Sequence, residues 1–193
     1  MTGNIEPDNV DQEIISHLQT DGRITYEKLG KLVGYTGMGV KKRVKRLVDA
    51  GVIRFSTLVN PKSLGFYSAL VLLEMENAEA MEGLLSRFED CPRVVHIFTA
   101  LGGYNIIALV VAENEDTFES ISMEKCSLRS AEGIRRSEFY PVGSIHYSPF
   151  LPIRRHLARQ EKTATPCGVD CITCKRYQSK LCVGCPATRW YQG

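Results

Sequence analysis

The apolar residues of this 193-residue chain change their spacing near residue 66, and this change requires two different cores. Before it, apolar residues recur at helical spacing in three segments. The first covers 9–20, the second follows the N-cap candidate Thr25, and the third runs from the N-cap candidate Thr36 to about residue 50. Three short helices, the third of them basic, predict a helix-turn-helix. The β-rich residues 52–59 are expected to form the strand of a wing.

One face of each later helix in this unit is expected to point into its core. Residues three, four or seven apart lie on the same side of a helix. The inward residues predicted on this basis are Leu29, Leu32 and Val33 on the second helix and Val40, Val44, Leu47 and Val48 on the third.

After residue 66 the pattern alternates between strand and helix. Strands are expected over 67–75, 93–100, 104–112 and 134–141, with helices over 78–89 and 116–125. The order βαββαβ predicts a ferredoxin-like α+β domain. Two helices cover one face of such a sheet, so the other face needs a partner. A homodimer is the usual solution, and a higher oligomer is the alternative.

The charge distribution suggests parts with different partners. Net charge is +2 over 1–60, −6 over 61–150 and +6 over 151–193. Basic ends favour a polyanion as partner. The predicted organisation is a winged helix-turn-helix DNA-binding domain over 1–60, a ferredoxin-like domain over 61–147, a basic linker over 148–165 and a Cys-rich metal-binding tail over 166–193.

Neither a membrane span nor an export signal is predicted. The chain has no apolar run of the roughly 18 residues that a span requires. Its first residues lack the basic start and apolar core of a signal peptide. A cytoplasmic protein is therefore expected.

The third helix carries the residues expected to bind double-stranded DNA. The first residues of such a helix reach base edges, and later cations meet phosphates. Thr36, Met38 and Lys42 are therefore assigned to the groove, and Arg43 to DNA or to a pairing within the domain. The predicted phosphate contacts are Lys41, Lys45, Arg46 and Arg54.

Five of the seven cysteines lie in the last 27 residues, which predicts a metal site. Cys171 and Cys174 with Cys182 and Cys185 have the spacing of a four-thiolate zinc site, which leaves Cys167 spare. The alternative is a [4Fe–4S] cluster, held by the first three tail cysteines and one later cysteine. Zinc is preferred as the commoner structural ion. In either case the ion supplies much of the folding free energy of the tail.

The other two cysteines, Cys91 and Cys126, stand alone in the sequence. Free cysteine is among the residues most often buried, and it packs like a small apolar side chain. Both are therefore interpreted as ordinary core residues.

Several short motifs follow one another in a recognisable order. Examples are Gln19-Thr20-Asp21-Gly22-Arg23, Val40-Lys41-Lys42-Arg43-Val44 and Gly51-Val52-Ile53. On these motifs the chain resembles the Lrp/AsnC (feast/famine) family of prokaryotic transcriptional regulators. The resemblance implies a DNA-binding regulator rather than an enzyme, with the βαββαβ domain as its effector-sensing and oligomerisation part.

The same resemblance implies a small-molecule effector, commonly an amino acid, bound between subunits. The expected contacts are Gly102, Gly103, Tyr104 and Asn105 in the turn before the third strand. The family usually has Asp where this chain has Asn105, and it lacks the Cys-rich tail. The tail suggests that a metal centre, through redox or metal sensing, modulates the regulator.

Two alternative functions are open from the sequence. Siroheme decarboxylases resemble the family in fold, and His96, His146 and His156 with Arg93, Arg135 and Arg136 are the residues to consider for such an enzyme. The other alternative is a metal-sensing adaptor whose three-helix part binds protein. The concentrated basic helix favours DNA over both.

Overall fold

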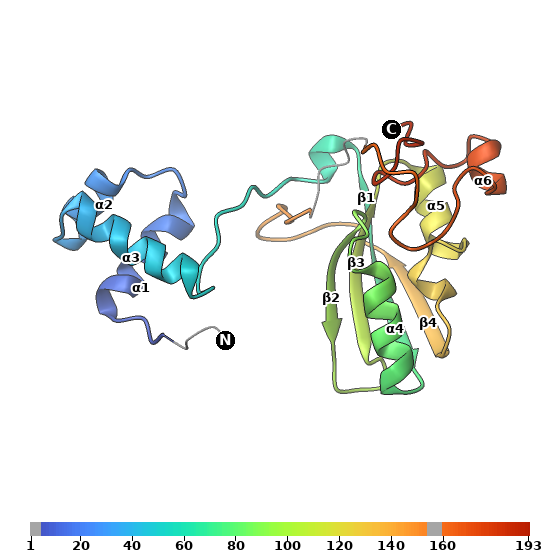
Figure 1. Ribbon diagram of the computed structural model, residues 1–193, viewed down its shortest axis with the longest axis horizontal. Helices are drawn as coiled ribbons and strands as arrows, with labels where there is room; N and C mark the ends of the chain where they lie inside the picture. Colours follow the sequence, from blue (N-terminus) through green and yellow to red (C-terminus); the bar gives the residue numbers. More distant parts are fainter. Residues whose placement is uncertain (1–4, 154–159) are drawn as a thin grey trace. The chain divides into compact units, whose positions relative to one another are not determined.

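The computed structural model describes residues 5–153 and 160–193. Contacts divide the chain into two compact units, Met1–Thr57 and Leu58–Gly193. Figure 1 shows three helices in the first unit and a sheet with its helices in the second. Residues 154–159 of the predicted linker lie outside the described residues.

The first unit contains three helices with the predicted limits. They are α1 (Asn9–Thr20), α2 (Tyr26–Val33) and α3 (Gly37–Asp49). Both predicted threonine caps are present: Thr25 Oγ1 accepts from the Lys28 N–H at 3.2 Å, and Thr36 Oγ1 accepts from the Gly39 N–H at 3.1 Å. Asp8 caps α1 in the same way. These side chains supply acceptors to N–H groups that have no partner inside a helix.

The core of this unit confirms most of the inward residues and corrects two. Ile14, Leu29, Val33, Val40, Val44 and Leu47 are buried. The predictions for Leu32 and Val48 are wrong, because these side chains are 53% and 39% exposed. Each lies at the margin of its helix's apolar stripe, and the two partner helices cover only the middle of that stripe.

The turn between α2 and α3 is tight because a glycine lies beneath it. A Cβ atom added to Gly30 would lie 2.5 Å from the Tyr35 carbonyl oxygen and 3.1 Å from the Gly37 nitrogen. Gly34 ends α2 with φ of 72°, a left-handed conformation that glycine adopts without strain. The close approach brings α3 against α2.

The predicted wing strand over 52–59 is wrong. Within these residues, all of them described, the structure has one isolated β-bridge, from Val59 to Leu151. A strand requires a neighbour to pair with, and the three-helix unit offers no second extended segment among its described residues.

The second unit has the predicted βαββαβ order. Its elements are β1 (Tyr67–Met75), α4 (Ala78–Phe88), β2 (Val94–Thr99), β3 (Ile106–Ala112), α5 (Glu115–Met123) and β4 (Ile134–Pro141). The strand order is β2-β3-β1-β4, and all neighbours are antiparallel. This is the ferredoxin-like topology that the sequence predicts.

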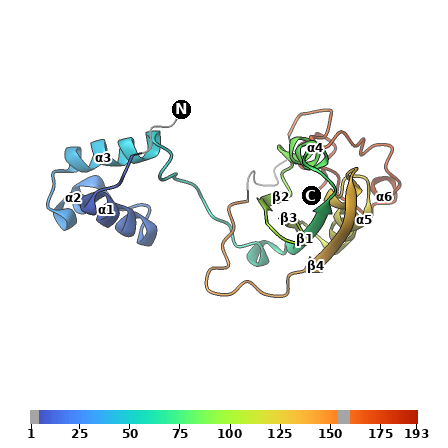
Figure 2. The same ribbon diagram turned by 90° about the horizontal axis from the view of Figure 1, so that it is seen from below.

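One face of the sheet carries the core. Ala69, Val71 and Leu73 alternate along β1 and pack with Leu84 and Phe88 of α4. Because side chains alternate along a strand, these residues share one face. Figure 2 shows α4 and α5 on the same side of the sheet.

On the opposite face, the described residues cover one end of the sheet. There Val95 and Val111 pack with Ile153. Elsewhere Leu70, Phe98 and Tyr140 are exposed. This open face is the surface for which the sequence predicts a partner.

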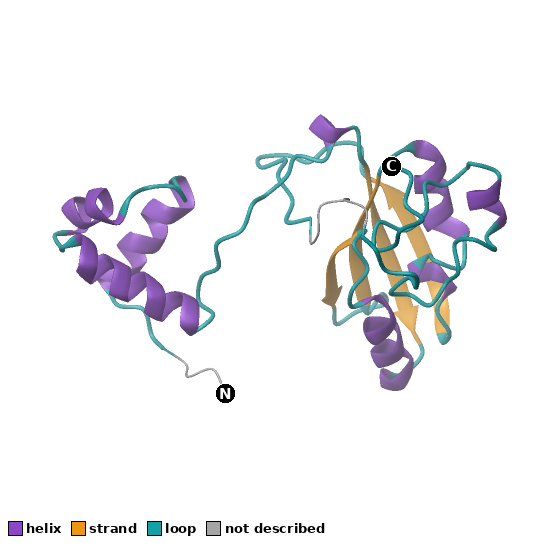
Figure 3. Cartoon of the chain, turned by 45° about the horizontal axis from the view of Figure 1, so that its top comes forward, coloured by secondary structure: helices purple, strands orange, loops and turns teal. Residues whose placement is uncertain are grey.

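The Cys-rich tail belongs to the second unit and is mostly loop, with one short helix, α6 (Lys175–Gln178) (Figure 3). It is bound to the helices of that unit. Thr117 Oγ1 accepts from the Val183 N–H at 3.2 Å, and Ser120 Oγ donates to the Leu181 carbonyl at 3.0 Å. The described part of the chain contains no helix that is long and apolar enough to cross a membrane.

Candidate DNA interface and cysteine cavity

The exposed side of α3 carries most of the predicted DNA contacts. Met38 is 74% exposed, and Lys41 and Lys42 are exposed beside it. Lys45 is exposed as well and pairs with Asp49 one turn later. Since Val40 and Val44 occupy the buried side, these cations are directed to solvent. Arg54, in the segment after α3, is also exposed.

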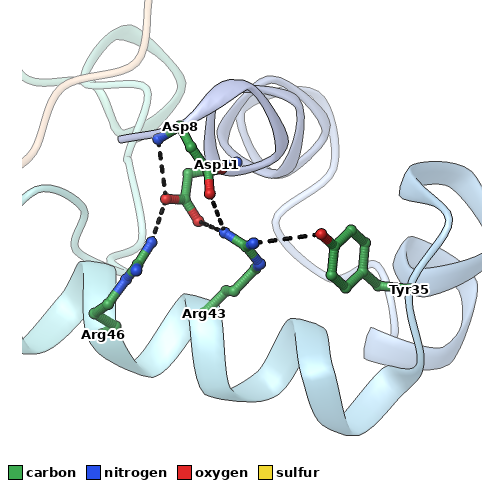
Figure 4. Close-up of polar contacts among 5 residues, drawn as sticks. All are labelled: Asp8, Asp11, Tyr35, Arg43 and Arg46. Atoms are coloured by element: carbon green, nitrogen blue, oxygen red, sulfur yellow. Dashed lines mark hydrogen bonds and ion pairs between the residues drawn. The ribbon is translucent and has the colours of Figure 1, made fainter. Parts of the chain in front are cut away.

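The buried carboxylate of Asp11 fixes α3 against α1, as Figure 4 shows. Arg43 Nη1 donates to Asp11 Oδ1 and to Asp8 Oδ2, both at 2.8 Å. Arg46 Nη2 donates to the other oxygen of Asp11. Asp11 is fully buried, whereas the Arg46 side chain is half exposed. One carboxylate on α1 therefore holds two arginines of α3.

Arg43 also lies over an aromatic ring of the helix-turn-helix turn. Its guanidinium carbon is 5.0 Å from the centre of the Tyr35 ring. The hydrogen bonds that Arg43 donates to Asp8 and Asp11 raise the pKa of Arg43 further above its usual range. The backbone N–H of Asp11 and the Arg43 side chain lower the pKa of Asp8. Of the two roles open to Arg43, the structure shows the pairing within the domain.

This anchoring was not foreseen in the sequence. Asp8 and Asp11 lie 35 and 32 residues before Arg43, and no local spacing connects them. The signal present was weak: an aspartate, Asp11, at a position that a wholly apolar helix face would occupy.

The second candidate site is a cavity lined by all seven cysteines of the chain. Its volume is about 50 Å³. The five tail cysteines, predicted as metal ligands, are Cys167, Cys171, Cys174, Cys182 and Cys185. The structure therefore brings these five together around one space. None of the seven is in a disulfide.

Cys91 and Cys126 are partly rather than fully buried, which differs from the expected core role, and both line this cavity. Each lies three residues after the last residue of a helix, α4 for Cys91 and α5 for Cys126. The two positions are equivalent in the two halves of the βαββαβ repeat. A comparison of the two halves of the sequence would have shown that Cys91 and Cys126 occupy equivalent positions.

A buried ion pair lies beside the thiols. Arg93 makes a two-pronged pair with Glu113, at 2.9 and 2.8 Å, and donates to the Gly184 carbonyl at 2.5 Å. Burial raises the pKa of four thiols, and the Arg93 guanidinium opposes this rise in each. The four are Cys91, Cys126, Cys171 and Cys185.

The thiols surround the cavity rather than converge on one point. Among the described residues no three His, Cys, Asp or Glu side chains are grouped closely enough to hold a single metal ion as they stand. A metal assignment therefore rests on the shared cavity and on the chemistry of thiols.

The predicted effector turn has side chains that are already engaged. Asn105 Oδ1 accepts from the Met75 N–H at 2.8 Å, and its Nδ2 donates to the Met75 carbonyl at 3.0 Å. The Tyr104 hydroxyl donates to Glu138 of β4. Gly102 and Gly103 are exposed. The carboxamide of Asn105 thus has a structural role that a carboxylate cannot fill, because only the amide both donates and accepts.

Three of the residues considered for an enzyme have separate partners in the described part of the chain. Arg93 is buried in its pair with Glu113, whereas Arg136 pairs with Glu138 on the open face of the sheet. The His96 ring lies 5.5 Å from the Phe98 ring on β2. His156 lies outside the described residues.

Comparison with known proteins identifies the family. Residues 7–54, which span the three helices, match a family model described as winged helix-turn-helix DNA-binding. The leucine-responsive regulatory protein of Rhizobium meliloti is 30% identical over 129 residues, which cover 65% of this chain and 83% of that protein. The chain belongs to the Lrp/AsnC family. It is a DNA-binding transcriptional regulator, as the motifs predicted.

Further proteins are similar to this chain in sequence or in fold. The HTH-type transcriptional regulator FL11 of Pyrococcus furiosus is 27% identical over 127 residues, covering 65% of this chain and 84% of its own. The structure of Escherichia coli AsnC matches with a TM-score of 0.66 at 23% identity, over 75% of this chain and 97% of that one. FL11 and the leucine-responsive regulatory protein are both named as regulators, which agrees with the prediction of a regulator rather than an enzyme.

Proposed function

We propose that this Lrp/AsnC-family regulator contacts its operator through the exposed side of α3 and is controlled by a Cys-ligated metal centre in its second unit. The observation that carries the proposal is the seven-cysteine cavity, because the three-helix unit alone accounts for DNA binding but not for the tail. Occupancy of the centre would set the DNA affinity.

The DNA contacts follow from the exposure of each side chain. Met38 and Lys42 face solvent near the start of α3 and would meet base edges, whereas Lys41 and Lys45 would meet phosphates. Thr36 contributes mainly its cap, since its hydroxyl already accepts from the Gly39 N–H. Arg46 is half exposed and would reach a phosphate from the same side of α3 that pairs with Asp11. Arg54 adds a further phosphate contact after the helix.

The open face of the sheet would form a homodimer. Leu70, Phe98 and Tyr140 expose apolar surface there, and an unpartnered sheet face of this kind is usually covered by a second copy. Two copies would present two α3 helices to two half-sites. Sedimentation of the purified chain tests this directly, and a monomer at micromolar concentration would contradict it.

The tail can transmit the state of a metal centre because arginines fasten it to the domain. Arg87 of α4 donates to the Cys167 carbonyl at 3.2 Å. Arg176 of α6 donates to Ser120 at 2.6 Å and pairs with Glu119 on α5. A metal-thiolate centre would hold the tail in this docked position, since metal binding and folding of such segments are linked. Zinc and a [4Fe–4S] cluster are the two candidate centres.

A small effector at the Gly-rich turn is a further part of the proposal. The exposed backbone of Gly102 and Gly103 is open to a ligand, although the Asn105 amide is already used by Met75. Titration calorimetry with the amino acids tests this part by itself.

The decisive experiment is an anaerobic purification followed by metal analysis, a visible spectrum and DNA binding before and after removal of the metal. The proposal expects a bound metal and a DNA affinity that changes at least several-fold when a chelator removes it. A metal-free protein with full DNA affinity would overturn metal control and leave the regulator assignment intact. A protein that does not shift promoter DNA even at low salt would favour the adaptor alternative.

A further inference from the structure

The cysteine cavity is built by two parts of the chain that are far apart in sequence. The tail supplies five thiols, and the ferredoxin-like domain supplies Cys91 and Cys126 from the segments that follow α4 and α5. Both helices lie on the same face of the sheet, so the equivalent segments after them end next to each other. The tail then closes the space over them.

The domain cysteines share one cavity with the five tail thiols, which line its other sides. Ordinary core cysteines do not share a cavity with five other thiols. The interpretation of Cys91 and Cys126 as ordinary core residues therefore does not explain why they share a cavity with the tail thiols.

A positive charge also lies at the wall of the cavity. Arg93 lines it and forms a buried ion pair with Glu113. Cations of this kind stabilise thiolates, and they tune metal clusters bound by thiolates.

The dimensions favour a cluster over a single ion. A cavity needs roughly 10–15 Å³ to hold one water, so about 50 Å³ has room for several atoms between the thiols. A zinc ion closed by four sulfurs at about 2.3 Å leaves no such room. Thiols spaced around a volume suit a core in which iron and sulfide lie between them.

The cavity lies next to a second, larger cleft. Cys126, Cys167 and Cys174 line both the cavity and this cleft of about 750 Å³. Lys125 and Lys175 lie at that cleft. A centre in this place would be enclosed on the side of the sheet and reachable by small molecules from the outside.

We propose that the seven-cysteine cavity holds an iron–sulfur cluster whose thiolate ligands come from both the tail and the ferredoxin-like domain, with Cys91 and Cys126 as the domain's ligand candidates, at least one of which binds iron. The inference rests on the proposed metal centre and extends it to residues outside the tail. Its consequence is that the cluster ties the tail directly to the ends of α4 and α5.

The test compares iron and sulfide in anaerobically purified full-length proteins. The wild type is expected to contain about four iron and four sulfide per chain, the content of a [4Fe–4S] cluster, with its broad visible absorbance. The double variants Cys91→Ser/Cys126→Ser and Cys91→Ala/Cys126→Ala should both lose most of it. Val169→Ala is the matched control, since Val169 lines the same cavity without a sulfur and should retain the cluster.

Unfolding of the metal-free proteins separates ligand loss from damage to the fold. The metal-free alanine pair should unfold at the same urea midpoint as the metal-free wild type, because alanine preserves a small apolar wall. Loss of iron with an unchanged midpoint supports the proposal. A lower midpoint with iron retained would identify Cys91 and Cys126 as packing residues only and overturn it.

The remaining outcomes distinguish this inference from the proposed function. Iron and sulfide that are equal in wild type and double variants would overturn the shared ligand set, and the tail centre would stand. One zinc per chain without sulfide would overturn the cluster and leave a metal centre. A wild type that binds no metal would overturn both.

Discussion

Arg43 on α3 donates to the fully buried carboxylate of Asp11 on α1 at 2.8 Å. The same carboxylate accepts from Arg46 one turn further along α3. Because a buried carboxylate is costly unless it is paired, the two helices are held at the register in which both arginines reach it. The contact links the capping of α1 to the presentation of the basic helix.

Replacement of Asp11 by Asn should therefore destabilise the three-helix unit. The expected loss is about 2–3 kcal/mol in the free energy of unfolding, because an uncharged amide cannot compensate two guanidinium groups at a buried position. Urea denaturation followed by circular dichroism measures it. Asp49→Asn is the control: its pair with Lys45 is exposed and should contribute less than about 0.5 kcal/mol. Equal effects of the two variants would contradict the role given to Asp11.

The exposed lysines of α3 should account for part of the salt dependence of DNA binding. Each phosphate contact contributes about 0.9 to the slope of log affinity against log salt concentration. The double variant Lys41→Gln/Lys42→Gln should reduce the slope by up to about 2 if both lysines meet phosphates, and by about 1 if Lys42 meets a base. Lys62→Gln, outside the three-helix unit, should leave the slope unchanged. Fluorescence anisotropy across a salt series gives the answer, and an unaltered slope in the double variant would exclude these phosphate contacts.

The glycine beneath the helix-turn-helix turn should not tolerate a side chain. In Gly30→Ala the new Cβ would meet the Tyr35 carbonyl oxygen, so α3 must move away from α2. A loss of about 1–3 kcal/mol of stability is expected, together with weaker DNA binding. Gly83→Ala on α4 is the opposite case: its Cβ would meet nothing within 4 Å, and alanine should stabilise the helix by about 0.5–1 kcal/mol. Thermal unfolding of both variants tests the pair, and a tolerated Gly30→Ala would show that the turn is not tightly packed.

The sequence predicts the elements because their signals are local. The limits of α1 and β1 agree with the structure to the residue, since Asn9–Thr20 and Tyr67–Met75 have clear periodicity and clear ends. The prediction of a wing strand is wrong because its signal is not local. A strand depends on a partner that the local sequence does not specify, and residues 52–57 have none among the described residues.

The two sites depend on contacts between residues far apart in the sequence, and the sequence predicts only those residues that lie close together in the chain. The tail cysteines could be grouped because their spacing is short, whereas Cys91 joins them across 76 residues of chain before Cys167. The Arg93–Glu113 pair beside the thiols likewise joins the residue before β2 to the residue after β3. Such contacts follow from topology, and they become visible only once the sheet order is known.

The stability of the fold should depend on the amide N–H donor of the Asn105 side chain. In Asn105→Asp the carboxylate can still accept from the Met75 N–H, but it cannot donate to the Met75 carbonyl and would repel it. The expected cost is about 1–3 kcal/mol in urea denaturation. Asn77→Asp is the matched control, because Asn77 caps α4 only by accepting from the Ala80 N–H, and aspartate caps equally well. Two equally stable variants would contradict the structural role of the Asn105 amide.

Glu138 on the open face of the sheet should give the fold a distinct acid response. The hydroxyl of Tyr104, and then that of Tyr140 and the Arg136 guanidinium, lower the pKa of Glu138 from its ordinary 4.5 to about 2. A carboxylate whose pKa is lower in the folded state stabilises that state above pH 4.5, and this contribution is lost as the pH falls from 4.5 towards 2. The urea midpoints of wild type and Glu138→Gln should therefore differ at pH 7 and converge over this range. Tyr104→Phe, which removes the strongest donor, should raise the pKa of Glu138 in a carboxyl NMR titration; a pKa that stays near 2 would show that Tyr104 does not hold the carboxylate.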